Sequence, residues 1–170
     1  MSSNQQFWLN ELRRAFDQSF AEEAGLGFER QKDRFIYFSM LDERYAINAL
    51  HLSGFAKAGP LTHLPARTPG LLGISSVRGQ LVPVFSLAPF LKINQPAEAP
   101  QWLAIAGHAD PVAFAVSELT GLDSSDEQHA LGNETHPYIN AYCTLRGIRH
   151  ALIAMDQLYR DVTQTRNFHG

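Results

Sequence analysis

The chain has 170 residues, of which 45% are hydrophobic and 18% charged, and this composition excludes a disordered protein. The formal net charge is −3 and the sequence holds no block of Lys or Arg, so nucleic acid is not an expected partner. The single cysteine excludes an internal disulfide. The sequence holds neither a signal-peptide pattern nor a run of roughly 18 apolar residues, so we expect a cytoplasmic protein without membrane insertion.

The first expected element is a helix over residues 4–24, within an N-terminal extension at 1–30. Its apolar side chains recur at three- and four-residue steps, and Gly25 supplies a stop. The apolar stripe consists of Trp8, Leu9, Leu12, Phe16 and Phe20. Two interpretations stay open: the stripe packs on its own domain, or it docks on a partner.

Strands are expected next. Aromatic and β-branched residues at 34–41 and apolar residues at 45–52 flank a turn and predict a hairpin. The stretch 58–70 holds three prolines and two glycines, so we expect an irregular connection there.

The stretch GISSVRGQLVPVFSL, residues 73–87, places Arg78 and Gly79 between two apolar strands. This pattern predicts a hairpin with Arg78 exposed at its tip, where Gly79 allows a positive φ. Pro83 lacks an amide hydrogen, so its strand is an edge, or Pro83 lies at a bulge or with its nitrogen facing outward.

Arg78 therefore has two interpretations. It is a solvated turn residue, or it presents a guanidinium to a partner, a role that suits a planar and permanently charged group. The dipeptide Arg146-Gly147 recurs in another expected turn without the rest of the stretch, and we interpret it as structural.

The second half repeats the strand pattern after a Pro- and Ala-rich linker at 93–101. Large residues alternate with alanines at 102–107 and 112–117, which indicates one face packed by large side chains. The remaining expected elements are a polar loop, a hairpin, a short helix and a tail, at 124–137, 138–155, 156–162 and 163–170.

Short strands with turns between them predict small barrels or a sandwich rather than βαβ units. The linker divides the expected lobes, one at about 33–92 together with the C-terminal end and the other at about 101–155. The expected core residues are Phe35 or Ile36, Ile47, Leu81, Val84, Leu103, Phe114, Ile139 and Leu152.

Patterns for catalysis are weak. The seven histidines show no metal-ligand spacing, and GISSV at 73–77 lacks the second glycine of a nucleophile elbow. Cys143 alternates with apolar residues on an expected strand, so it is a buried hydrophobe unless His and Asn partners converge on it. The sequence therefore predicts no catalytic residue, no metal and no cofactor, and it favours a binding module.

The chain resembles the CheW-like domain family over about residues 33–162, and we set the domain at 31–162. Ser76, Ser86, Asn48 and Ser117 depart from the family pattern at polar positions and leave its apolar frame intact. The family pattern Gly-Val-x-Asn-Leu-Arg-Gly-x-x-x-Pro-Val-x-Asp-Leu is matched at Gly73, Val77, Arg78, Gly79, Pro83, Val84 and Leu87.

The resemblance implies a mainly β fold in which two SH3-like five-stranded barrels share a core, with a groove between them, an N-terminal helix and a short C-terminal helix. It also implies a non-enzymatic adaptor between the cytoplasmic tip of a methyl-accepting receptor and the regulatory domain of a CheA-type histidine kinase, recruited to membrane receptor arrays. Arg78 would lie at the mouth of the region between the lobes. The partner-binding residues implied are Gly73, Val77, Arg78, Gly79 and Pro83.

The N-terminal extension and the wording of the motif look nearer to adaptors of the type IV pilus, or twitching, branch than to flagellar ones. Two alternatives to the adaptor remain open. One is a scaffold or competitor with the same fold and no receptor coupling, and the other is a small β-barrel enzyme.

Overall fold

The computed structural model describes residues 33–167, with gaps at 66, 96–98, 126 and 132–134. Of the N-terminal segment it describes three residues, Asn10, Glu11 and Arg14, which are helical and exposed. The helix expected at 4–24 thus lies, for most of its length, outside the described residues. Its docking stays a prediction.

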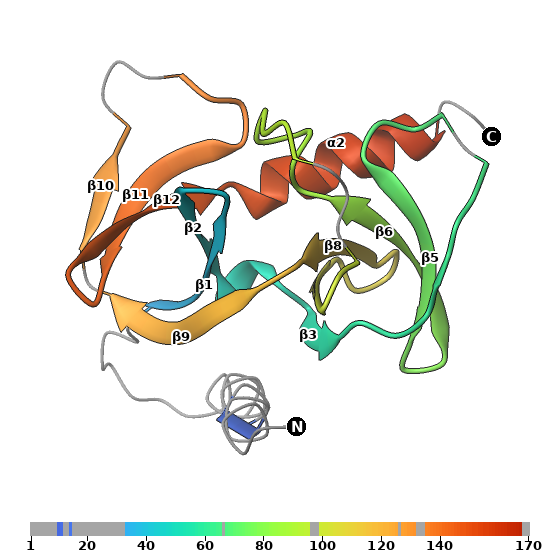
Figure 1. The fold of residues 1–170 in the computed structure, drawn as a ribbon, viewed down its shortest axis with the longest axis horizontal. Helices are drawn as coiled ribbons and strands as arrows, with labels where there is room; N and C mark the ends of the chain where they lie inside the picture. The colour runs from blue at the N-terminus through green and yellow to red at the C-terminus, as the bar shows by residue number, and fades with distance from the viewer. Residues whose placement is uncertain are drawn as a thin grey trace.

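The described residues form two six-stranded sheets and a C-terminal helix (Figure 1). Sheet A has the order β10-β11-β12-β2-β1-β9 and sheet B the order β3-β7-β8-β6-β5-β4. The strands of sheet A are β1 (Asp33–Met40), β2 (Glu43–Asn48), β9 (Leu119–Ser125), β10 (Gln128–Ala130), β11 (Ile139–Leu145) and β12 (Ile148–Ile153). Those of sheet B are β3 (Gly54–Lys57), β4 (Leu61–Thr62), β5 (Leu71–Val77), β6 (Gln80–Ser86), β7 (Trp102–Ala106) and β8 (Val112–Val116). A short 3₁₀ helix, η1 (Ala49–His51), leads from β2 to β3, and α2 (Met155–Asn167) follows β12.

The mainly β architecture with a C-terminal helix agrees with the expectation, and the strand count differs from it by one in each sheet. Four strands have no counterpart among those expected individually, namely β3, β4, β9 and β10; all four lie at sheet edges, and β4 and β10 have only two and three residues. β4 falls in the stretch expected to be irregular, and β10 falls in the expected polar loop. Such short edge strands leave almost no periodicity in a sequence.

The chain passes between the sheets, so neither lobe is one continuous segment. Sheet A takes its strands from residues 33–48 and 119–153, whereas sheet B takes them from 54–116. The two sheets therefore do not correspond to the expected lobes, one at about 33–92 together with the C-terminal end and the other at about 101–155. The Pro- and Ala-rich linker joins β6 to β7, which belong to the same sheet. Composition marked the linker as a loop but did not reveal which strands pair across it.

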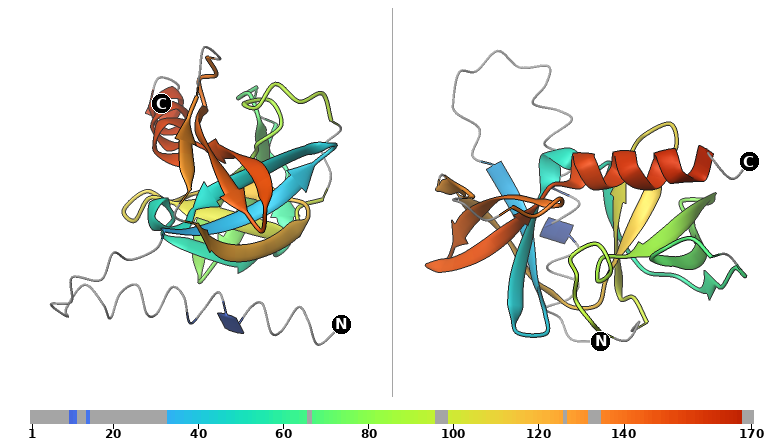
Figure 2. Two further views of the ribbon diagram at one scale, coloured as in Figure 1. Left: turned by 90° about the vertical axis from the view of Figure 1, so that its left-hand side faces the viewer. Right: turned by 90° about the horizontal axis from the view of Figure 1, so that it is seen from above.

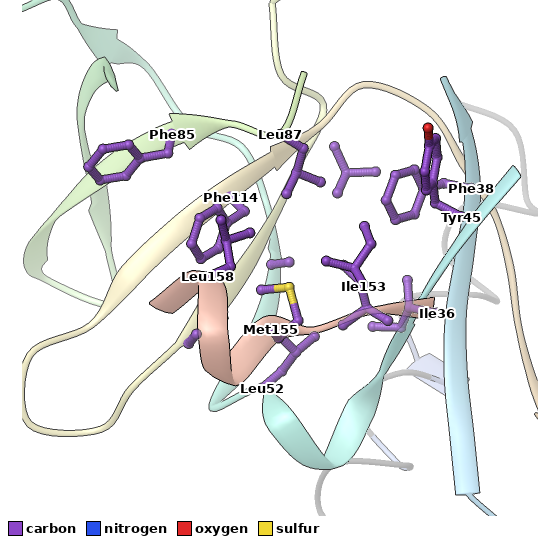
Figure 3. Close-up of a cluster of buried hydrophobic side chains, with 14 of the residues drawn as sticks. Ile36, Phe38, Tyr45, Leu52, Phe85, Leu87, Phe114, Ile153, Met155 and Leu158 are labelled. Atoms are coloured by element: carbon purple, nitrogen blue, oxygen red, sulfur yellow. The ribbon is translucent and has the colours of Figure 1, made fainter. Parts of the chain in front are cut away.

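A shared core lies between the sheets and is closed by α2, which extends from sheet A across to sheet B in the views of Figure 2. Figure 3 shows Ile36 and Phe38 from sheet A facing Phe114 from sheet B, with Met155 of α2 between them. Each sheet also buries its other face. The cluster inside sheet A consists of Phe35, Tyr37, Ala46, Cys143, Leu145 and Leu152, and that inside sheet B of Val82, Val84, Leu103, Ile105 and Ala113.

Most expected core residues are buried. Those confirmed are Phe35, Ile36, Ile47, Val84, Leu103, Phe114 and Leu152. Leu81 was wrong, because it is 73% exposed. Strand alternation places Val82 and Val84 inside sheet B, while Leu81 points to the other face, next to the hairpin tip and beyond the shared core. Ile139 is only half-buried, at the first position of β11 and the margin of the shared core.

Three local details differ from the sequence expectations or explain them. α2 begins at Met155 and continues to Asn167, so it includes part of the expected tail. β9 extends to Ser125, into the expected polar loop. The Asn48 departure has a structural reason, since its side-chain oxygen accepts a 3.0 Å hydrogen bond from the backbone N–H of Leu50 and caps η1.

None of the helices within the described residues could cross a membrane, and α2 has 13 residues.

Candidate partner-binding site

The turn between β5 and β6 holds Arg78 at the tip of a hairpin. Both turn residues have left-handed backbones, with φ of 52° at Arg78 and 79° at Gly79, and Val77 pairs with Gln80 to close the hairpin. Two positive φ values in a row define the two-residue turn that matches the natural twist of paired strands. The sequence predicted the positive φ for Gly79 only. Arg78 is exposed, as predicted, on a turn whose shape is set by the strands.

A hollow lies beside this tip. Its walls come from the turn and the first half of β6, from the start of β3, and from the connection between β7 and β8. The lining residues are Ser53, Gly54, Val77, Arg78, Gln80, Val82, Ile105, Gly107, His108 and Pro111. All of these belong to sheet B or its connections, so the hollow lies within one lobe rather than between the two.

The hollow borders the part of β6 that has no neighbour on one side. β6 is an internal strand, yet β8 pairs only with Val84, Phe85 and Ser86. Pro83 comes just before that pairing and lies opposite Ile74 of β5. The sheet order therefore contradicts the first of the three alternatives for Pro83, an edge strand, although the position itself has a paired strand on one side only.

One wall of the hollow is fixed by the hydroxyl of Ser53. It donates to the backbone carbonyl of Gly107 at 2.8 Å and lies 3.2 Å from that of Ile105. These bonds tie the entry of β3 to the end of β7, so the floor of the hollow is part of the sheet framework.

Gly73, which the resemblance placed among the partner-binding residues, is buried. A Cβ there would collide with the backbone carbonyl of Thr62 in β4. Only glycine allows this close approach of the two strands. Gly73 therefore fixes the base of the hairpin and presents no side chain to a partner.

The charge of Arg78 has no partner within the part of the chain that the structure describes: no hydrogen bond or ion pair is formed by its guanidinium there. Arg146 behaves differently on an almost identical turn, with φ of 50° followed by 75° at Gly147. Its Nε–H donates to Oδ2 of Asp123 at 2.9 Å, and this hydrogen bond raises the pKa of the guanidinium. The pair supports the structural interpretation of Arg146.

A family model described as a CheW-like domain matches residues 34–162. The chain belongs to the CheW-like domain family. No curated protein sequence matches it. Among solved structures it is similar to the scaffolding protein TtCheW from Thermoanaerobacter tengcongensis, with a TM-score of 0.64, 16% identity and coverage of 72% of this chain and 89% of that one. The resemblance stated from the sequence is thereby confirmed for family and fold.

Elsewhere in this CheW-like domain, Cys143 lies opposite His150 on paired strands β11 and β12. Both side chains are buried, and burial raises the pKa of the Cys143 thiol to about 11. A nucleophilic cysteine needs the opposite shift, towards the thiolate. A histidine therefore lies opposite Cys143, but the raised pKa of the thiol is the reverse of what a catalytic pair needs. Among the described residues, no group of three His, Cys, Asp or Glu side chains could hold a metal ion.

The CheW-like domain has a second hollow, on sheet A, which sequence reasoning did not find. The guanidinium of Arg149 stacks over the Tyr142 ring, with Cζ 3.7 Å from the ring centroid, and both side chains form part of the wall of this second hollow. Its lining residues are Asp42, Glu43, Arg44, Tyr45, Ile139, Tyr142, Arg149 and Ala151. Sequence reasoning also missed the walls that β3 and β7 contribute to the Arg78 hollow, because those residues lie more than 20 positions from Arg78 and carry no motif.

Proposed function

We propose that this CheW-like domain is a non-enzymatic adaptor in a bacterial chemosensory array. It joins the cytoplasmic tip of a methyl-accepting receptor to the regulatory domain of a CheA-type histidine kinase, and it works in the cytoplasm at membrane receptor clusters. The single observation that supports an exposed binding surface is the Arg78 guanidinium, which has no partner among the described residues and is held on a defined turn beside a hollow. Arginine is enriched at the energetic centres of protein interfaces.

Five residues were expected to bind partners, and in this proposal they have three different roles. Arg78, Val77 and Pro83 supply contacts, because Arg78 is exposed and the other two are half-buried. Gly79 allows the turn, and Gly73 fixes the approach of β4 and β5 beneath it. Exposed Leu81 extends the apolar part of this surface, a contribution that the sequence had assigned to the core.

The non-enzymatic part of the proposal is supported by the state of Cys143. Its thiol is buried and its pKa is raised, so the nucleophile that the enzyme alternative would need is in its unreactive form. The scaffolding protein that shares this fold supports the same class, although its 16% identity establishes the fold alone.

Isothermal titration calorimetry with purified full chain tests the adaptor directly. The titrants are the regulatory domain of the CheA-type kinase and a receptor tip fragment, both from the same organism. Binding to both, and recovery of a three-component complex by gel filtration, is the expected result. Binding to the kinase alone would favour the competitor without receptor coupling, and binding to neither would contradict the proposal.

The pilus branch is a finer proposal and has its own test. A strain lacking this chain is expected to lose twitching and to keep swimming. Loss of swimming with intact twitching would assign the chain to a flagellar system instead.

A further inference from the structure

We propose that the Arg78 hollow receives an aspartate or glutamate side chain from a protein partner. The inference rests on the proposed function, and it goes further by naming the chemistry that the partner must present. It is carried by the charge of the hollow, by its apolar walls, and by the contrast with the Arg146 turn.

The hollow carries a positive charge that the described residues leave uncompensated. The guanidinium of Arg78 makes no ion pair or hydrogen bond with any described residue. None of the residues that line the hollow in the described part of the chain is Asp or Glu, and His108 adds a second potential donor. A guanidinium offers five N–H donors in a plane, and a carboxylate accepts two of them side by side. The complementary group is therefore an anion of that shape.

The Arg146 turn shows what an arginine in this backbone conformation does when a carboxylate is within reach. There the carboxylate comes from Asp123 of β9, 2.9 Å from the Arg146 Nε. At the Arg78 tip, the guanidinium lies beside Gly54 of β3, the strand at the far edge of the same sheet. A Cβ built on Gly54 would lie 3.9 Å from Nη2 of Arg78, close enough for a short acidic side chain to pair with it. Because that position is glycine, no described residue supplies a carboxylate there, and we assign the carboxylate to a partner.

The walls of the hollow indicate a protein side chain rather than a free anion. Val77, Val82, Ile105 and Pro111 all line it. Such walls exclude water from one side of the guanidinium, which strengthens an ion pair formed there. They also contact the aliphatic stem of an acidic side chain and its apolar neighbours, which a small inorganic anion does not have. The partner segment therefore carries an acidic residue between apolar ones.

A matched pair of substitutions at Gly54 tests this directly. Gly54→Asp places a carboxylate beside Arg78, whereas Gly54→Asn places a side chain of the same size without charge. The φ of Gly54 lies outside the left-handed range, and the nearest atom to the added Cβ, Cδ1 of Ile105, lies at 3.5 Å, so a Cβ is accommodated there without backbone strain in both variants. The probes are the kinase regulatory domain and the receptor tip fragment, titrated into full-length variants whose thermal melting has been checked.

We expect Gly54→Asp to weaken binding of one probe at least tenfold relative to Gly54→Asn, because the internal carboxylate neutralises Arg78 and repels the incoming one. Equal affinities of the two variants, or tighter binding by Gly54→Asp, would overturn the inference and leave the adaptor function standing. If the wild-type chain binds neither probe, the adaptor function itself fails and the inference fails with it.

Charge reversal at the two tips provides a second test that does not depend on the folding of the Gly54 variants. Arg78→Glu is exposed and is expected to weaken the same probe by tenfold or more. Arg146→Glu is the control and is expected to leave both affinities unchanged, because its turn lies at the opposite end of the molecule (Figure 1). An Arg78→Glu variant that binds like the wild type would overturn the inference.

Discussion

The two Arg-Gly hairpin tips have the same dipeptide and the same backbone but differ in what surrounds the guanidinium. Arg78 and Arg146 have φ of 52° and 50°, and the glycines that follow have φ of 79° and 75°. Arg146 pairs with a carboxylate of its own chain, whereas Arg78 is beside a glycine and a hollow whose described lining holds no acidic side chain. The turn is a local property of the dipeptide and its strands. The role of the arginine is decided by residues far away in the chain.

This difference has a consequence for reading motifs. An Arg-Gly pair between two strands predicts the turn and says little about binding. The two tips differ in the residue that lies beside the guanidinium, which is Asp123 in one lobe and Gly54 in the other. If this is correct, the two tips depend on the same frame, the two sheets with their shared core, and differ only in the residues around each guanidinium.

The largest expected effect is on the frame that carries both tips. Phe114 is fully buried in the core shared by the two sheets, so Phe114→Ala is expected to cost about 3–5 kcal/mol of unfolding free energy. Urea denaturation followed by far-ultraviolet circular dichroism, which reports on the strands of both sheets, measures this. Both lobes should unfold together at the lower denaturant concentration, because the deleted side chain contacts the shared core.

Two separate transitions in that variant would show that the sheets unfold independently. In that case the two tips do not share a frame, and their stabilities could not be compared through one unfolding transition. An unchanged midpoint would mean that the register of β8 against β6 and β7 is wrong.

How much of this frame could be predicted follows from the physics of each element. Alternation of large residues with alanines identified β7 and β8, aromatic and β-branched residues identified β1, and an apolar run identified β6. The family motif located the Arg78 hairpin. The pairing of β1 and β2 with β9 to β12 was not predictable from periodicity, since no local pattern encodes which distant strands pair.

The site was predicted only as far as the motif reaches. Arg78, Gly79 and Val77 were placed at the tip by the sequence, while Ser53, Gly54 and the end of β7 were not. Those walls depend on long-range strand pairing. The prediction that Leu81 is buried was wrong for a related reason. The first residues of β6 extend beyond the core, and the sequence of the strand does not show where this happens.

The next largest effect concerns binding. Arg78→Ala is expected to weaken one partner by about thirtyfold, or roughly 2 kcal/mol, as the loss of an arginine at an interface centre commonly does. Because Arg78 is exposed, the substitution should change the unfolding free energy of the protein by no more than about 0.5 kcal/mol. Titration calorimetry and thermal melting of the same samples measure both quantities.

Arg146→Ala is the matched control. It removes the ion pair with Asp123, so a small loss of stability and unchanged binding are expected. Equal binding losses in the two variants would remove the functional difference between the tips. Early melting of Arg78→Ala would make Arg78 a structural turn residue.

A smaller and equal effect is expected at the two glycines. Gly79 and Gly147 have positive φ, and no atom lies within 4 Å of a Cβ added at either position. The cost of Gly79→Val and Gly147→Val is therefore backbone strain alone, about 1–2 kcal/mol each. Thermal melting should fall by the same amount in both. A clear inequality would show that the two turns, although alike in φ, differ in the strain that their strands can absorb.

The smallest effect distinguishes the tips by pH. His150 belongs to β12 of the Arg146 hairpin. Its ring is in edge contact with Tyr37, and its Nδ1 lies 2.9 Å from the carbonyl oxygen of Ile148. Burial lowers its pKa from the ordinary value of 6.5, so the folded protein favours the neutral ring. The unfolded chain therefore binds more protons in the window just below pH 6.5, and the stabilisation present above that pH is lost as the pH falls through the lowered pKa. The strands and turn of the β5–β6 hairpin, residues 71–86, contain no histidine.

Amide hydrogen exchange followed by NMR between pH 5 and 8, corrected for the intrinsic pH dependence of exchange, measures this at each tip. Protection of the β11–β12 hairpin should fall in acid before that of β5–β6. His150→Phe keeps an aromatic ring against Tyr37 and removes the titrating group, so it should flatten the pH dependence of β11–β12 protection. Burial also lowers the pKa of His136, and part of the global acid sensitivity should persist in that variant for this reason. If the two hairpins lose protection together in the wild type and His150→Phe changes nothing, the pH response belongs to the shared frame rather than to the Arg146 tip.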